Sequence, residues 1–545
     1  MTKGKTGEAS LGPNNAQPQP SAGVPGTLAP ANAILNRLGY GLAGLIVFMS
    51  LPLPFFWDSI LLGSEVGQHF VQNGLWAWIL PPQLDSGHPP AFGWYLALWW
   101  TALGPTLPVA HLAMLPVLLL IWGSFYRLLR LLLPHASQQS AHWIGAGLLL
   151  LEPTFAAQAI HVGPDLVLLG LYLSALVCLL ERRPAVLSLL LLAMGMTSLR
   201  GCLGMAALWV TAFALAWPAG ASAGKKTDSR QPFRQHFRQL FRQYFRQPFH
   251  QLFHQPFRQL NWLLLPFGLA ALGLVAWFSY HASQTGWVLA NPDSAWSANQ
   301  KWAGFEGILR NVGLIVWRLL DFGRLVLWVP GLLWMLTLWR AKEPIQRQER
   351  RMLLVFGIPL LVLSLAFLPF ANPVAHRYFL VVFVLALPWF AYRIHLLDPT
   401  RSRFYGIAIL SMLAFGHRWI YPDKVAQGWD ASLAHLPYFS LMSQAWSEIP
   451  DPEAVYTEFP LYKPMQSVRP GSQQKRTSFK KAEGDWLSRD YVLYSNIIND
   501  IPHGTYDQIT NTWPLQREWE RGKVFIRLYR RPGMEPMELP ELPNE

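Results

Sequence analysis

Residues 108–130, PVAHLAMLPVLLLIWGSFYRLLR, decide the structural class of this chain. The run is almost uninterrupted apolar sequence over about 20 residues, the length that an α-helix needs to cross the hydrocarbon core of a bilayer. It ends on Arg127 and Arg130, and basic residues at the end of a span face the cytoplasm. The segment therefore predicts one transmembrane helix together with its direction.

The rest of the chain shares this apolar character. Of its 545 residues, 14% are charged and 52% are hydrophobic, and the mean hydropathy is +0.21. Soluble proteins carry about 25% charged residues, so this chain could not cover the surface of soluble domains. We therefore expect a polytopic α-helical membrane protein with about eleven transmembrane helices. The candidate spans are 34–55, 108–130, 141–158, 165–181, 185–200, 203–219, 261–280, 312–338, 352–370, 378–394 and 403–420.

Basic residues fall in alternate loops between these spans, whereas no Lys or Arg lies between Arg37 and Arg127. The positive-inside rule therefore places the N-terminus in the cytoplasm and residues 56–107 in an outer loop. An odd number of spans leaves residues 422–545 outside as well. The segment 91–104 could be a twelfth span only if every later loop were inverted. We therefore expect it to be a helix in the outer interface, where its tryptophans fit.

Two segments have low complexity. Residues 1–30 are polar and rich in Pro, Gly, Ala and Asn, which predicts a disordered cytoplasmic tail. Within 221–260, Phe recurs at every fourth position from Phe233 to Phe257. This period drifts against the 3.6 residues of a helical turn, so we interpret the block as a cytoplasmic low-complexity insertion. Contact with anionic lipid is the alternative. Nucleic acid is not an expected partner, because no folded nucleic-acid-binding motif accompanies the block.

The transmembrane domain is predicted over 31–421, and after Tyr421 the composition becomes that of a small soluble domain. Period-two runs and turn residues indicate strands in this region. We expect a periplasmic α/β domain of about 100 residues over 422–545. Its predicted elements are an amphipathic helix at 424–447, strands at 454–459 and 491–495, and a hairpin over 515–530 that turns near Gly522.

Ionisable residues at the outer ends of spans are the candidates for function, because charge near hydrocarbon is costly and is kept for a purpose. A carboxylate there could act as general base, and arginines could hold a phosphate group through bidentate contacts. Together they suit transfer from a lipid-linked phosphate donor. The candidates are Asp58 after the first span, Asp85 and His88 in QLDSGHPP (83–90), Asp165 in HVGPD (161–165), Arg200, Arg310, Arg377 and Tyr378.

Each candidate also has a structural alternative. Asp58 could cap the helix that follows it. Asp85 and His88 could stabilise the turn before Pro89 and Pro90. Asp165 lies at a helix start that favours acids, and Arg377 could be an interfacial anchor.

Two further polar residues receive no function. His161 is interpreted as a hydrogen-bonded polar residue, and Glu152, inside an apolar run, is left unassigned. The outer loops hold too few clustered His and acidic residues for a dedicated metal site. We expect no metal site and no cofactor.

These motifs resemble a known family. An acid directly after the first span, Asp85 with His88-Pro89-Pro90, and an aromatic helix ending in Gly104 are similar to the first outer loop of the C-type glycosyltransferase superfold. The pattern most resembles the protein O-mannosyltransferases and the lipid A aminoarabinose transferase. Gly163-Pro164-Asp165 resembles their segment at the start of the fourth span, and His376-Arg377-Tyr378 their late Arg-Tyr motif. The resemblance covers about 35–395.

The resemblance implies an integral enzyme of the cell inner membrane. Such an enzyme takes a polyprenyl-phosphate sugar as donor, passes the sugar to a lipid, glycan or protein acceptor on the periplasmic face, and inverts the anomeric centre. Asp58 corresponds to the family's catalytic acid residue, and Asp85 and His88 position a substrate. Ser59 stands where mannosyltransferases often carry Glu, and Gly163 replaces the usual Arg. Donor binding then falls on Asp165, Tyr378 and the cations Arg200, Arg310 and Arg377.

Two other functions remain open. An oligosaccharide ligase or polymerase of the cell envelope would also place arginines near lipid phosphate on the outer face. A transporter or flippase for lipid-linked sugars would carry charge in mid-membrane and repeat symmetry between its halves, and the sequence shows neither.

Overall fold

The computed structural model describes most of the chain outside its predicted low-complexity segments. The described residues are 29–216, 258–292, 297, 301–341, 345–372, 374–419, 429–461, 480–481, 486–497 and 503–540. The predicted tail, except for its last two residues, and nearly all of the predicted Phe repeat block lie outside these residues.

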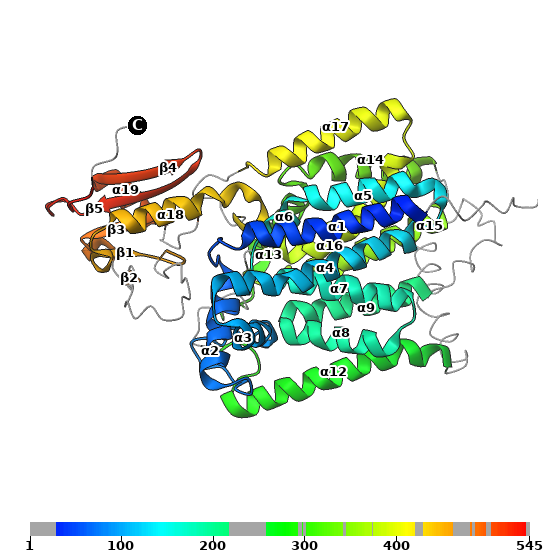
Figure 1. Ribbon diagram of the computed structural model, residues 1–545, viewed down its shortest axis with the longest axis horizontal. Coiled ribbons are helices and arrows are strands. Elements are labelled where there is room, and N and C mark those ends of the chain that lie inside the picture. The colour runs from blue at the N-terminus through cyan, green and yellow to red at the C-terminus, as the bar shows by residue number, and fades with distance from the viewer. Residues whose placement is uncertain are drawn as a thin grey trace, which may run out of the picture.

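Long helices lie side by side and form the main body of the molecule (Figure 1). Six of them are long and apolar enough to cross a membrane, and a seventh candidate is a bent pair, α6 and α7, among the residues that the structure describes. The protein is thus a multi-pass membrane protein, as predicted. The helices of this body are α1 (Ala29–Ser50), α4 (Leu107–Leu132), α5 (Gln139–Leu151), α6 (Pro153–Ala159), α7 (Pro164–Leu180), α8 (Pro184–Thr197), α9 (Leu199–Ala216), α12 (Arg258–Thr285), α13 (Gly304–Leu320), α14 (Leu325–Ala341), α15 (Arg347–Phe367), α16 (Leu380–His395) and α17 (Pro399–Gly416).

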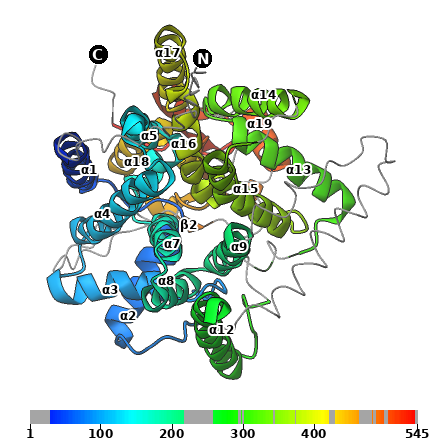
Figure 2. The ribbon, with the colours of Figure 1, turned by 90° about the vertical axis from the view of Figure 1, so that its right-hand side faces the viewer.

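The helix α4 illustrates how the sequence determines where a helix begins and how it packs. Its first turn is closed by Thr106, whose hydroxyl accepts the Val109 N–H at 3.4 Å. Pro108 also lies in that turn, where no N–H is needed. The helix packs between α1 and α7, and the indole of Trp122 donates to the carbonyl of Asn36 on α1 at 3.1 Å. The helix α16 is buried along nearly its whole length and lies among α5, α15 and α17 (Figure 2).

Two predicted spans are wrong as single helices. The span 141–158 is divided at Glu152, which ends α5 and caps α6 by accepting the Phe155 N–H. The span 312–338 is divided into α13 and α14 at Asp321–Arg324, where Phe322 and Gly323 have positive φ. At each break a charged side chain is buried and forms an ion pair within the protein.

The predicted outer loop, residues 56–107, contains short helices, and one of them is the helix expected over 91–104. After α1 the chain forms a π-helix at Ser59–Glu65, then α2 (Val66–Asn73) and α3 (Ala91–Leu103). The helix α3 packs against α2 and α4. This arrangement supports a short helix beside the bundle rather than a further span, since α3 has 13 residues and a span needs about 20.

The C-terminal part is a small α/β unit with a five-stranded sheet in the order β2-β1-β3-β5-β4. The hairpin predicted over 515–530 is confirmed, with Gly522 at positive φ in its turn. The strands predicted at 454–459 and 491–495 are confirmed as β1 and β3. The elements are α18 (Pro437–Glu448), β1 (Val455–Thr457), β2 (Lys480–Lys481), β3 (Tyr491–Ser495), α19 (His503–Thr512), β4 (Leu515–Arg521) and β5 (Val524–Arg530).

The amphipathic helix predicted at 424–447 is wrong over 429–436, and its residues 424–428 lie outside the described part of the chain. The described residues before Pro437 form two short 3-10 helices, Trp429–Ala431 and Leu433–His435, and the α-helix begins only at Pro437. Proline fits the first turn of a helix but not its interior, so it gives a natural start for α18. The 3-10 segment instead packs against the membrane part of the molecule.

Candidate active site

The site centres on Arg377, in a short 3-10 helix that leads into α16. Its guanidinium contacts three carboxylates: Asp58 at 3.1 Å, Asp165 at 3.3 Å, and Asp430 in a closer ion pair. All four side chains are largely buried, and Asp58 is the most exposed of the carboxylates at 14%. Residues from three distant parts of the chain therefore meet on one arginine.

A second arginine completes the group. Arg200, at the start of α9, pairs closely with Asp165 and lies 3.7 Å from Asp58. The ring of Tyr378 lies against both guanidiniums, 4.5 Å from that of Arg200 and 5.4 Å from that of Arg377. We call Asp58, Asp165, Arg200, Arg377, Tyr378 and Asp430 the Arg377 cluster. It contains three carboxylates and two guanidiniums.

The two structural alternatives for the acids fit the geometry poorly. Asp58 precedes the π-helix at Ser59–Glu65 but makes no capping hydrogen bond with its side chain. Asp165 lies in the first turn of α7, yet both of its oxygens are in ion pairs with Arg200 and Arg377. These contacts indicate that both carboxylates point toward Arg200 and Arg377 and do not serve as caps of the helices beside them.

His88 lies next to the cluster and supports it. Its Nδ1 accepts the backbone N–H of Leu199 at 3.3 Å, at the turn that carries Arg200. Burial and, to a smaller extent, the charge of Arg200 lower the pKa of His88 to about 4, while Asp58 opposes the change. The imidazole is therefore neutral near pH 7 and acts as a hydrogen-bond acceptor.

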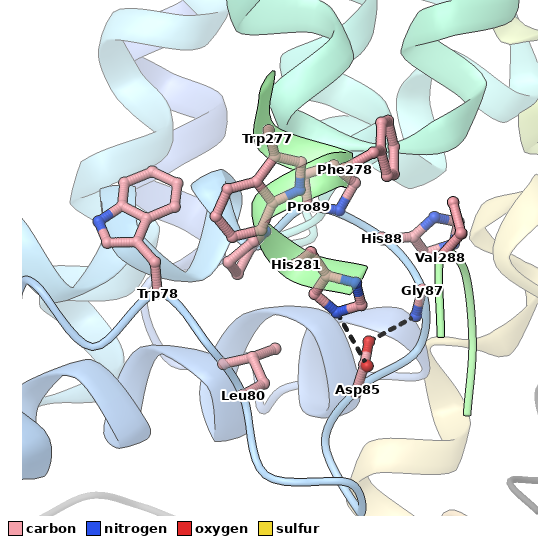
Figure 3. A pocket seen from close by; sticks show the side chains of 11 residues that line it. Trp78, Leu80, Asp85, Gly87, His88, Pro89, Trp277, Phe278, His281 and Val288 are labelled. Atoms are coloured by element: carbon pink, nitrogen blue, oxygen red, sulfur yellow. Dashed lines mark hydrogen bonds and ion pairs between the residues drawn. The ribbon is translucent and has the colours of Figure 1, made fainter. Parts of the chain in front are cut away.

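Asp85 has a different environment, beside the end of α12 (Figure 3). One of its oxygens accepts from His281 Nε2 at 3.1 Å and from the indole of Trp287 at 2.6 Å, and the other accepts the Gly87 N–H at 2.9 Å. The carboxylate lines a small crevice whose other walls are mainly aromatic and proline side chains and which His88 also lines. Asp85 therefore ties the outer loop to α12 and does not join the Arg377 cluster.

Arg310 also lies apart from the cluster. It is exposed on α13, and its guanidinium donates to neutral oxygens, those of the Asn311 side chain at 3.2 Å and the Asn372 carbonyl at 3.5 Å. Of the predicted site residues, the structure thus brings together Asp58, Asp165, Arg200, Arg377 and Tyr378, with His88 beside them.

Glu152 received no function from the sequence. It belongs to a second buried network, which lies next to Arg377. Its carboxylate accepts from Arg324 at 2.7 Å, and Arg324 also donates to Thr154. Asp321 accepts from His376 at 2.8 Å, and His376 is the residue before Arg377. This network fixes the α13–α14 junction against α6 and against the segment that presents Arg377.

Asp430 is the site residue that sequence reasoning missed. It lies in the 3-10 helix Trp429–Ala431, in a stretch predicted to be part of an ordinary amphipathic helix. One signal could have found it: Asp430 follows the last predicted span closely, as Asp58 follows the first. Across the described part of the chain, no group of three or more His, Cys, Asp and Glu side chains is arranged to hold a metal ion. The acids of the site are paired with arginines.

No protein-family model matches this sequence, and no curated protein matches it. Among solved structures, the chain is similar to ArnT from Cupriavidus metallidurans bound to undecaprenyl phosphate, at 13% identity over 91% of this chain and 98% of that chain, with a TM-score of 0.47. The apo state of ArnT from the same organism aligns at 16% identity over 76% of this chain and 70% of that chain, with a TM-score of 0.46. The functional assignment therefore depends on the residues of the site itself.

Proposed function

We propose that this protein is a membrane glycosyltransferase that takes a sugar from a polyprenyl-phosphate donor. The Arg377 cluster carries the proposal, because three carboxylates and two arginines are buried together at the ends of apolar helices. Burying charge at such a place is costly, and the residue types are those that a base and a phosphate-binding site require. The resemblance of the outer loop to C-type glycosyltransferases supports the same reaction.

The proposed chemistry is a single displacement at the anomeric carbon. Asp58 accepts the proton of the acceptor hydroxyl or amine as the acceptor oxygen or nitrogen bonds to the sugar. The bond between the sugar and the phosphate oxygen breaks, and the polyprenyl phosphate leaves with that electron pair, so the anomeric centre inverts. Asp58 suits this role because it is the most exposed carboxylate of the cluster and lies at the edge of the outer loop.

The departing phosphate requires positive charge, which arginine supplies in a geometry that lysine lacks. We propose that Arg200 and Arg377 face the phosphate side of the donor, with Tyr378 between them. Arg310 is the third candidate, because its observed partners are neutral oxygens and its charge is less compensated. His88 and Asp165 hold Arg200 in place.

The replacement of Asp58 by Asn tests the proposal. The variant keeps the shape of the side chain but cannot take a proton, so transfer from polyprenyl-phosphate-linked hexoses and pentoses should fall about 10²–10⁴-fold. Asp398→Asn is the matched control. Asp398 caps α17 by accepting the Arg401 N–H at 3.0 Å, and Asn caps a helix equally well. An Asp58→Asn protein with wild-type turnover would remove Asp58 as the base, whereas a wild-type protein that transfers no sugar from these donors would contradict the proposed reaction.

A further inference from the structure

Among the described residues, the C-terminal domain contributes one side chain to the Arg377 cluster, that of Asp430. Asp430 is the third carboxylate on Arg377 and comes from a segment outside the helical bundle. We propose that Asp430 is a positioning residue for sugar transfer, so that the active site is completed by the C-terminal domain. This inference depends on the proposed transferase function and extends it to a part of the chain that the sequence did not connect with chemistry.

The backbone around Asp430 is held against the membrane part of the molecule. The amide of Gln158, on α6, donates to the Asp430 carbonyl at 2.9 Å. The hydroxyl of Thr154, also on α6, donates to the carbonyl of Ala431 at 3.3 Å. Both side chains are buried, so these bonds are shielded from water. The position of the Asp430 carboxylate is therefore set by α6 and not by the C-terminal sheet.

A second contact lies a few residues further along the chain. His161 and His435 face each other with their Nε2 atoms 2.8 Å apart. The ring of Phe56 stacks on both, with its centroid 5.2 Å from that of His161 and 4.7 Å from that of His435. Phe56 is two residues before Asp58, so the same packing that docks the C-terminal segment also borders the proposed base.

Electrostatics indicate what Asp430 contributes. Arg377 and Arg200 together carry two positive charges and Asp58, Asp165 and Asp430 carry three negative charges when ionised. The three carboxylates repel one another, and each is attracted to the guanidiniums. Asp430 takes part of the Arg377 charge, and without it Arg377 would be shared by Asp58 and Asp165 alone. Asp58 would then be held more firmly in its ion pair with Arg377 and would be less available to an acceptor. Asp430 thus acts on the reaction through Arg377.

The test compares Asp430→Asn and Asp430→Glu in the full-length protein, with a polyprenyl-phosphate-linked sugar as donor. For Asp430→Asn we expect kcat to fall about 10-fold or more, while KM for the donor stays within about twofold, because the change weakens the base and not donor binding. The acid limb of the pH–rate profile should move to lower pH, because the variant lacks a negative charge that favours protonation of the carboxylates near it. Asp430→Glu restores the charge and should recover part of kcat.

Asp490→Asn is the matched control in the same domain. Asp490 pairs with Arg531 at 2.8 Å on the domain surface, and both side chains are at least one-third exposed, so its loss should leave kcat and the pH profile unchanged. The pH profile must be interpreted with every charged or titratable group that faces Arg377 or Asp430. These groups are Asp58, His88, Asp165, Arg200, Arg318, His376, Tyr378 and His435.

Several results would overturn the inference. One is an Asp430→Asn protein with wild-type kcat and an unmoved acid limb. Another is a lower KM with unchanged kcat, which would mean that Asp430 obstructs the donor. Equal losses in the Asn and Glu variants, with a lowered thermal midpoint, would show a purely structural role.

If Asp430→Asn is not recovered from membranes, Gln158→Met serves instead. This variant loosens the backbone at Asp430 but keeps the charge of Asp430, and an unchanged kcat there would also count against the proposal. A wild-type protein that transfers no sugar from any polyprenyl-phosphate donor would instead contradict the proposed function, so the two failures are distinguishable.

Discussion

Arg377 shows how a membrane protein can keep several charges out of water. A lone buried carboxylate would lose its hydration without compensation, at a cost of several kcal/mol. Here Asp58, Asp165 and Asp430 share one planar guanidinium, whose fixed fork reaches several oxygens at once. Arg200 and Tyr378 extend the arrangement. Removing either arginine would leave the three carboxylates with a single positive charge among them, so Arg200 and Arg377 have a structural role as well as their proposed chemical one.

His435 represents the opposite case, a residue that is buried because it is neutral. Its Nδ1–H donates to the Ser432 carbonyl at 2.8 Å. Its Nε2 then accepts the Nε2–H of His161. Burial lowers the pKa of His435 to about 4, although its hydrogen bond to Ser432 opposes the change. A charged His435 would therefore disturb the contact that docks the C-terminal segment.

This gives a prediction for acid stability. An unfolded chain binds a proton at His435 below pH of about 6.5, whereas the folded protein binds it only near pH 4. The contribution of neutral His435 to stability is therefore complete above about pH 6.5 and is lost as the pH falls toward 4, by up to about 3 kcal/mol. We expect the thermal midpoint of the detergent-solubilised protein to fall between pH 7 and 4.5, and to fall less for His435→Gln.

His135→Gln is the control, because His135 is exposed in the loop after α4. It should keep the full pH dependence of the wild-type protein. Equal pH dependence of the thermal midpoint in His435→Gln and wild-type proteins would show that His435 does not titrate in this way.

At the scale of elements, the junction between α13 and α14 decides how the bundle packs. Gly323 has φ of +81°, and a Cβ at this position would overlap the backbone carbonyl of Met412 on α17. A Cβ at Gly416 would likewise overlap the carbonyl of Phe322. Because neither glycine has a side chain, the backbone of the junction and the backbone of α17 can come into direct contact. Sequence averages could not predict this, because mean apolarity over 312–338 favours one continuous helix and does not register a break.

Replacing Gly323 by Ala should destabilise the protein. The positive φ alone costs about 1–2 kcal/mol for a residue with a Cβ, and the overlap with Met412 forces α17 to shift. Gly313→Ala is the control, since Gly313 lies within α13 with open space around its would-be Cβ, and Ala is a better helix former than Gly. Thermal unfolding in detergent should show a lower midpoint for Gly323→Ala and an unchanged or higher one for Gly313→Ala. The same midpoint for both variants would contradict the proposed close approach.

At the scale of the whole molecule, the sequence could predict the kind of protein and most of its helices. Long apolar runs and the period-two pattern of the C-terminal strands are local signals. The same holds for Asp58, Asp165 and Arg377, because each stands at the end of an apolar run. The pairing of Arg377 with Asp430, and of Glu152 with Arg324, was not predictable. These partners are far apart in the sequence, and no periodicity connects them.

The described loops that follow α4, α7 and α16 lie at the end of the bundle opposite the C-terminal domain (Figure 1). At that end Arg127 and Arg183 both pair with Glu181, and Ser140 on α5 contacts His395 on α16 at 2.7 Å. The helix α7 runs from Asp165 in the Arg377 cluster to this end. The proposed active site and the basic loops thus lie at opposite ends of the same helices.

This arrangement allows a direct test of orientation. If the basic end is cytoplasmic, the C-terminal domain and the proposed site are outside. Cys178 and Cys202, the two cysteines of the chain, are first replaced by Ser. A single cysteine is then introduced as Ser443→Cys, on the exposed face of α18, or as Ser137→Cys, in the exposed loop after Arg130. A membrane-impermeant maleimide should label the Ser443→Cys protein in intact cells and the Ser137→Cys protein only after lysis. The reverse pattern would place the site on the cytoplasmic face, and labelling of both from outside would contradict the alternation of loops from which the orientation was inferred.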